Sequence, residues 1–122
     1  MENLVAGDLQ IDVGQDAIGG PIKLVWKGKS NDRHPGKIFQ PFFARILDVA
    51  GERGAAIEMH FQQLEHFNSS TITAIIQLIQ EARSKGIKLV ILFDASLKWQ
   101  KLSFDALRVF AKGNDLLELR SP

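Results

Sequence analysis

The chain has 122 residues, the length of one domain with a single core, and its 45% apolar and 24% charged residues are typical of a folded globular protein. Fifteen Lys and Arg against 14 Asp and Glu give a formal net charge of +1, which argues against binding to nucleic acid or to an anionic membrane. Since there is no cysteine, disulfides, thiolate zinc sites and cysteine nucleophiles are excluded, and the lack of a long apolar run or cleavable basic N-terminus makes a cytoplasmic location the expectation.

Two strands and a helix are expected in the first part of the chain. Residues 8–13 (DLQIDV) and 22–27 (IKLVWK) alternate as strands do, and the turn-rich stretch between them suggests an antiparallel pair. Residues 28–37 (GKSNDRHPGK) are expected to form a polar loop. A helix follows, with Pro41 near its start. Its apolar stripe consists of Phe39, Phe42, Phe43, Ile46, Leu47 and Ala50.

The rest of the chain reads as strands alternating with helices. Residues 57–62 (IEMHFQ) alternate as in a strand with one buried face, whereas residues 88–93 (KLVILF) are almost uniformly apolar, which is typical of an interior strand. Ser103 is placed to cap a third helix, and residues 116–119 are a candidate edge strand. The second helix lies between the two long strands, with an apolar stripe of Ile72, Ile75, Ile76, Ile79 and Ala82.

This order of elements predicts an α/β fold, a single domain over residues 1–122 with a mixed sheet of four to five strands and about three helices. Alternation of strand and helix after residue 55 implies parallel strands joined by a right-handed crossover, and the opening pair makes the sheet mixed. Open α/β sheets carry their sites at the carboxyl ends of the strands. We therefore expect the loop after Trp26, the junction at residues 68–71 and the loop after Phe93 to share one end.

Four small polar residues, Asn68, Ser69, Ser70 and Thr71, lie at the junction between a strand pattern and the second helix. Asn and Ser are preferred helix N-caps, because their side-chain oxygens accept hydrogen bonds from free backbone amides. A hydroxyl at a helix N-terminus is also a place where a phosphate would be stabilised by the helix dipole and those amides. The residues of the junction alone leave both roles open.

Enzyme chemistry and metal binding receive little support from the sequence. No Gly-x-Ser-x-Gly elbow surrounds Ser69, and His34 is better explained as a surface histidine than as its base. Asp94 ends an apolar strand but is interpreted as a turn or cap residue. A metal site could be drawn from Glu58, His60, Glu65 and His66, yet their spacing is weak and a solvated sheet face accounts for them. We predict no catalytic residue, no metal and no cofactor.

Basic residues gather near the junction, where the polar loop is expected to lie beside Ser69. They are either solvated loop charges or partners for a phosphate or an acidic protein. Trp99 is similarly open to two interpretations, an interface anchor or a lid over the core. The basic residues are Lys27, Lys29, Arg33 and Lys37.

The turn NSST at residues 68–71, followed by the helical pattern up to Lys85, resembles the STAS domain, the fold of anti-sigma-factor antagonists. In that family a strand leads into an Asp-Ser-Ser-Gly or Asp-Ser-Thr-Gly turn that opens a helix, and the Ser after the Asp is phosphorylated. By position this Ser is Ser69. The chain differs from the classical turn in having Asn68 for the Asp and Thr71 for the Gly.

Two longer stretches, residues 28–47 and 57–79, resemble the SiaC-type branch of STAS-like bacterial regulators. That branch has a Gly-x-Ser loop and a Tyr-Phe-Asn-Thr-Ser-Ser turn, whose Thr directly after the Asn takes the phosphate. Ser69 holds that acceptor position here, Asn68 keeps the motif, and His66 replaces the Tyr. Ser70 and Thr71 are the less favoured acceptors.

The resemblance implies a partner-switching protein without catalysis of its own. A histidine-kinase-like ATP-binding kinase would phosphorylate Ser69, a PP2C-type phosphatase would reverse the reaction, and only one form would bind the downstream target. That target is a diguanylate cyclase in the best-matching branch, and an anti-sigma factor or kinase in classical STAS proteins. Lys29, Arg33 and His66 are the candidate partner-binding residues. The alternative is a STAS-like scaffold that takes no phosphate, with Ser69 and Ser70 acting only as caps.

Overall fold

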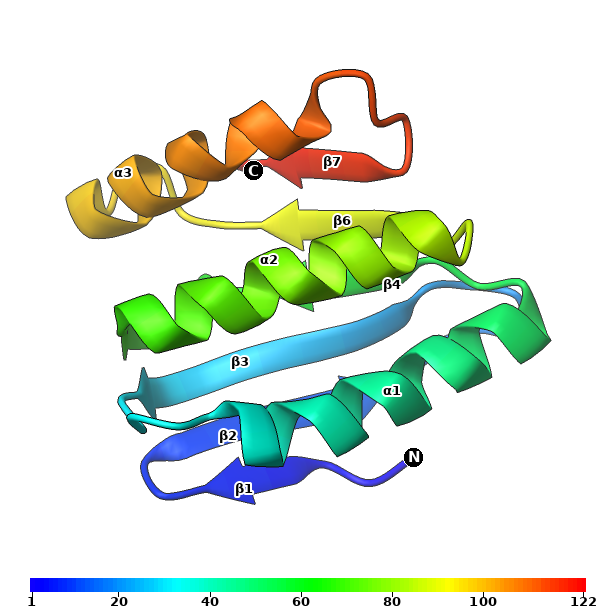
Figure 1. The fold of residues 1–122 in the computed structure, drawn as a ribbon, viewed down its shortest axis with the longest axis horizontal. Coiled ribbons are helices and arrows are strands. Elements are labelled where there is room, and N and C mark those ends of the chain that lie inside the picture. The colour runs from blue at the N-terminus through cyan, green and yellow to red at the C-terminus, as the bar shows by residue number, and fades with distance from the viewer.

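The computed structural model describes residues 1–122, in which three α-helices cover one face of a mixed seven-stranded sheet (Figure 1). The strands are β1 (Leu4–Ala6), β2 (Leu9–Gly14), β3 (Ile22–Ser30), β4 (Ile57–His60), β5 (Leu64–Phe67), β6 (Leu89–Leu92) and β7 (Leu117–Arg120). The helices are α1 (Gly36–Arg53), α2 (Ser69–Ser84) and α3 (Lys98–Ala106), and the short 3-10 helix η1 (Leu107–Ala111) continues α3.

The sheet has the strand order β1-β2-β3-β4-β6-β7, with β5 also paired to β3. The pairs among β1, β2 and β3 are antiparallel, whereas β3, β4, β6 and β7 run parallel. Parallel neighbours joined through α1, α2 and α3 bring the starts of all three helices to the edge of the sheet where the arrowhead of β3 lies (Figure 1). The predicted mixed α/β architecture with about three helices is therefore confirmed, and β6 is an interior strand as expected.

The predicted count of four to five strands was wrong, because β1 and β5 were missed. β1 has only three residues, too few for an alternating pattern. In β5 two exposed residues separate Leu64 from Phe67, so the sequence of this strand does not alternate either. β4 and β5 pair with the same strand on either side of a short turn, and the register on β3 shifts between Gly28 and Lys29. This long-range pairing makes β5 a strand.

β3 runs three residues further than the sequence indicated, and Gly28 makes the extension possible. Its φ of +84° is costly for residues with a side chain, and a Cβ at this position would collide with the carbonyl oxygen of Asp8. The same carbonyl accepts a hydrogen bond of 3.0 Å from the amide of Lys29. Beyond this irregularity Ser30 turns inward and is 3% exposed. Residues 28–30, expected to be loop, thus form the end of the strand beneath α2.

Two helices begin earlier than predicted. α1 starts at Gly36, so Pro41 lies inside it rather than in its first turn, and the carbonyl of Lys37 has no amide to accept from at that position. α3 starts at Lys98 with Leu97 as its N-cap residue, which places Ser103 in the interior of the helix instead of at its cap. Neither start has a side-chain cap, so the sequence offered no signal for them.

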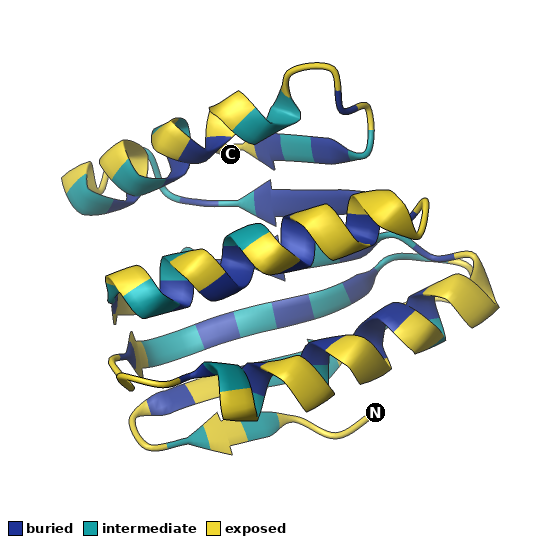
Figure 2. Ribbon diagram, viewed as in Figure 1, coloured by how far each residue is buried: buried dark blue, intermediate teal, exposed yellow.

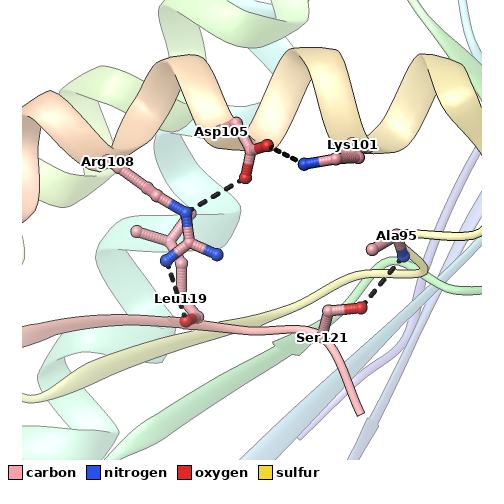
Figure 3. Close-up of polar contacts among 6 residues, drawn as sticks. All are labelled: Ala95, Lys101, Asp105, Arg108, Leu119 and Ser121. Carbon is pink, nitrogen blue, oxygen red and sulfur yellow. Dashed lines mark hydrogen bonds and ion pairs between the residues drawn. The ribbon is translucent and has the colours of Figure 1, made fainter.

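The C-terminal part of the chain is held to the sheet by a small polar network (Figure 3). The carboxylate of Asp105 accepts hydrogen bonds from Lys101 and Arg108 at 2.6 Å and 3.0 Å, and these bonds lower the pKa of Asp105. Arg108 also donates to the carbonyl oxygen of Leu119 in the edge strand β7. In a separate contact, the amide of Ala95 donates to the hydroxyl of Ser121. η1 is thereby tied to β7, and the segment that follows β6 is tied to the residue that follows β7.

Aromatic rings form a connected cluster in the core between the sheet, α1 and α3. Trp26 of β3 and Phe61 after β4 have ring centroids 4.8 Å apart, and Phe61 is again 4.8 Å from Phe104 of α3. Phe39 and Phe43 of α1 extend the cluster over Trp26. Figure 2 shows the buried residues of α1 and α2 facing the sheet. The rings thus pack β3, α1, α3 and the residue after β4 against one another.

Ile75 of α2 is fully buried against the sheet, as the helical stripe predicted. Replacing Ile75 by Ala should lower the free energy of unfolding by about 2 to 5 kcal/mol, because the lost side chain leaves a cavity. Denaturant unfolding followed by circular dichroism measures the loss. Ile18→Ala is the matched control, since Ile18 is fully exposed in the turn after β2 and should change stability by no more than about 0.5 kcal/mol. Similar losses from both variants would contradict this assignment of the helix face.

Candidate functional site

The candidate site lies where β3 and β5 end and α1 and α2 begin. Asn68 is the N-cap of α2: its extended backbone (φ −93°, ψ 175°) leads into the helix, and its Oδ1 accepts a hydrogen bond of 2.9 Å from the amide of Thr71. Of the two roles left open for the junction, capping therefore belongs to Asn68. Neither Ser69 nor Ser70 is needed to begin the helix.

Asn68 also joins the junction to the loop between β3 and α1. Its side-chain Nδ2 donates a hydrogen bond of 2.7 Å to the carbonyl oxygen of Asp32. Its backbone amide donates one of 3.0 Å to the carbonyl oxygen of Ser30. A carboxamide can accept from the helix and donate to the loop at the same time, whereas an ionised carboxylate at this position could only accept. Asn at this position thus holds two segments together that are 36 residues apart in sequence.

Beneath Asn68 two buried hydroxyl groups bridge β3 and α2. The oxygens of Ser30 and Thr71 are 2.6 Å apart, and the two residues are 3% and 0% exposed. Thr71 Oγ1 donates to Asn68 Oδ1 at 2.8 Å, which leaves Ser30 as the donor to Thr71. The hydroxyl of Thr71 is therefore enclosed within the protein. Sequence reasoning missed Ser30 and the structural role of Thr71, although the Gly-x-Ser loop and the hydroxyl three residues after a cap were visible signals.

Ser69 is the exposed hydroxyl of the junction. Its Oγ makes no hydrogen bond within the chain, and its carbonyl oxygen accepts from Thr73 at 3.1 Å. The amides of Ser69 and Ser70 occupy the first two positions of α2, where no carbonyl one turn earlier is available to accept from them. Ser70 is half-buried and faces α1. Among the three candidate acceptors, Ser69 has the most accessible side chain.

α3 packs against Phe67, the residue that directly precedes the junction. Phe67, the last residue of β5, packs against Trp99 and Phe104 at ring-centroid distances of 5.3 Å and 5.5 Å. Trp99 is thus partly buried against the core, as the lid interpretation expected. Gln100, which the sequence did not single out, is completely buried and donates to the carbonyl oxygens of Phe61 and Leu64 at 2.7 Å and 3.1 Å. These bonds fix the turn that leads into β5.

The four basic residues expected in one loop lie in three different places. Lys27 is on the helix-free face of the sheet and forms an ion pair of 2.8 Å with Asp12, which lowers the pKa of that carboxyl through the hydrogen bond. Lys29 is exposed on β3, directly opposite His66 of β5 in the strand register. Arg33 and Lys37 remain together near α2. The predicted cluster is therefore correct only for Arg33 and Lys37.

A groove of about 440 Å³ separates the start of α1 from the first turns of α2. The loop before α1 and its first turn contribute Arg33, His34 and Lys37, and α2 contributes Ser70, Thr73 and Gln77. No Asp or Glu lines the groove. Ser70, one residue after the exposed Ser69, thus lines the same groove as two cations and a histidine.

No protein-family model and no curated protein matches this sequence. Among solved structures, a chain of the complex between the diguanylate cyclase SiaD and its activator SiaC from Pseudomonas aeruginosa aligns over 100% of both chains, with a TM-score of 0.69 and 12% identity. The phosphorylated form of SpoIIAA, a Bacillus cell fate determinant, aligns over 92% of this chain and 90% of its own, with a TM-score of 0.57 and 12% identity. The chain has a STAS-like fold. At this identity the likeness is one of fold alone.

The residues considered above for metal binding or catalysis are not assembled into a site. His60 Nε2 is 3.1 Å from Glu58 Oε1 on the helix-free face, while Glu65 and His66 lie on β5, and no group of three or more potential ligands is arranged to hold a metal ion. Asp94 Oδ1 accepts from the amide and hydroxyl of Ser96, which confirms its interpretation as a turn residue.

None of the helices is both long and apolar enough to pass through a bilayer.

The buried hydroxyl pair allows a test of how the junction is held. Thr71→Val should lower the free energy of unfolding by about 1 to 3 kcal/mol, because it keeps the shape but leaves the buried hydroxyl of Ser30 without its acceptor. Adding Ser30→Ala should then cost less than it does in the parent protein, because both members of the pair are gone. A double-mutant cycle from denaturant unfolding measures the coupling. Strictly additive losses would show that the two hydroxyls do not interact.

Proposed function

We propose that residues 1–122 form a single STAS-like domain that acts as a phosphorylation-gated interaction protein in a bacterial partner-switching pathway, with Ser69 as the phosphate acceptor. The observation that carries this proposal is the division of roles at the junction. Asn68 caps the helix and Thr71 is enclosed, so the exposed hydroxyl of Ser69 has no structural task. The STAS-like fold, shared with SpoIIAA in its phosphorylated form, supports the same role.

The start of α2 suits a phosphate at Ser69. A phosphoserine carries about −1.5 to −2 charges and three acceptor oxygens. The positive end of the helix dipole and the free amides of the first turn favour such a group, as they favour other anions. The fold can therefore tolerate the modification, which adds about −1.5 to −2 charges beside the cations of the groove. A partner protein would distinguish the two forms by this difference in surface charge.

The proposed partners are a histidine-kinase-like ATP-binding kinase, a PP2C-type phosphatase and one downstream target. A diguanylate cyclase is the favoured target, because the neighbour with the higher TM-score comes from a complex of SiaC with the cyclase SiaD; an anti-sigma factor is the other candidate. The proposed contacts are Arg33, which lines the groove together with Ser70, and Lys29 with His66, which are exposed on the paired ends of β3 and β5. The domain itself performs no catalysis in this scheme.

Phosphopeptide mapping after co-expression with a histidine-kinase-like ATP-binding kinase from the same organism tests the proposal. The parent chain should gain the mass of one phosphoryl group, located on Ser69, and Ser69→Ala should gain none. Because the Ser69 side chain is exposed and is not the cap, Ser69→Ala should also change the free energy of unfolding by less than about 0.5 kcal/mol. That near-neutral stability separates loss of the acceptor from loss of the fold.

Ser70→Ala is the matched control, since it removes the neighbouring hydroxyl of the same turn and should leave the modification in place. Phosphate on Ser70 or Thr71 would contradict the assignment of the residue. If a kinase that is active on another substrate modifies none of the three, the switch itself is wrong. The domain would then be a STAS-like scaffold that does not take phosphate.

A further inference from the structure

The groove between the start of α1 and the first turns of α2 has the features of a peptide-binding site. We propose that it is the docking site for an extended acidic segment of a partner protein, which binds when Ser69 is unmodified. The control of this docking by phosphate rests on the function proposed above, whereas the docking itself does not.

The first argument is the charge of the groove. Arg33 and Lys37 form no ion pair within the chain, and no acidic side chain lines the groove. Of the other thirteen Lys and Arg residues, six have carboxylate partners within 4.0 Å and seven have none, so what distinguishes the groove is two unpaired cations in a lining without any acidic residue. The cations of the groove are therefore available to carboxylates supplied from outside, and Arg binds carboxylates particularly well.

The second argument is the length and the chemistry of the α2 wall. Ser70, Thr73 and Gln77 occur at the spacing that puts residues on one side of a helix, and all three line the groove. From Ser70 to Gln77 the helix rises by about 10 Å, which accommodates roughly three residues of extended chain. Hydroxyl and carboxamide groups can both donate and accept, so this wall can pair with the N–H and C=O groups of a peptide. A lone phosphate ion would use only one end of it.

The third argument concerns the occupant. The formal net charge of +1 and the short row of two cations give little attraction for a nucleic-acid backbone. An acidic peptide needs only one or two carboxylates at the end lined by Arg33 and Lys37, with peptide groups along α2. Ser69 precedes the groove residue Ser70, so a phosphate there would place negative charge at that same end. It would repel the carboxylates and compete for the two cations.

The docking can be measured with the unmodified protein and defined probes. We would titrate the isotope-labelled chain at low ionic strength with the peptide acetyl-Gly-Glu-Gln-Glu-Gly-amide, and follow the backbone amides by NMR. The proposal expects shifts concentrated at Lys37, Ser70, Thr73 and Gln77, and weaker binding as salt is added. The matched peptide in which Gln replaces both Glu residues should bind several-fold more weakly. Inorganic phosphate is a third probe and should shift only the end near Arg33.

Variants with the same change of charge separate the groove from general attraction. Arg33→Gln and Lys37→Gln should each weaken binding of the Glu peptide by about threefold to tenfold, because each removes a partly exposed ion pair. Arg45→Gln, also on α1, and Lys112→Gln, after η1, remove exposed cations outside the groove and should leave the affinity unchanged. Equal effects from all four variants, or shifts outside the groove, would overturn the proposal.

Control by Ser69 is tested with Ser69→Asp and with the phosphorylated chain. Both should bind the Glu peptide several-fold more weakly than the parent. If the peptide binds in the groove but no kinase modifies Ser69, the docking site stands and the phosphorylation switch fails. If Ser69 is phosphorylated but the Glu peptide binds no better than the Gln peptide, the docking site is wrong while the proposed function remains.

Discussion

The side chain of Asn68 is the interaction on which the candidate site depends. Its carboxamide accepts from the amide and hydroxyl of Thr71 and donates to the carbonyl of Asp32. The first two contacts begin α2, and the third holds the loop that leads into α1. Both walls of the groove therefore start from segments that this carboxamide joins.

Burial places the hydroxyls of one short turn in different environments. Gly28 lets β3 continue past a crowded backbone, so that Ser30 turns inward and meets Thr71. Thr71 is thereby committed to the interior. Ser69, one residue after the cap, projects where no other group of the chain binds it. Because Asn68 already caps the helix, the hydroxyl of Ser69 is not needed for capping.

Local signals in the sequence were sufficient for the helix stripe around Ile75, the cap region at Asn68 and the interior position of β6. They failed where the outcome depends on residues far apart in the chain. β5 is a strand because of its register on β3, and the buried Gln100 is recognisable only once α3 lies against the turn after β4. The basic residues were misplaced for the same reason: extending β3 by three residues moved Lys29 onto the sheet and left Arg33 beside α2. The position of Ser69 relative to the cations therefore could not be predicted from the periodicity of the sequence.

The two departures from the classical STAS turn, Asn68 for Asp and Thr71 for Gly, are in direct contact with each other. A carboxylate at position 68 could cap the helix equally well, but it would place a permanent negative charge next to Ser69 and opposite the carbonyl of Asp32. The carboxamide keeps the cap, adds the bond to the loop and leaves the turn uncharged. In such a turn a phosphate would be the first negative charge rather than the second. The contrast between the two forms would then be largest at the end of the groove where Arg33 and Lys37 lie.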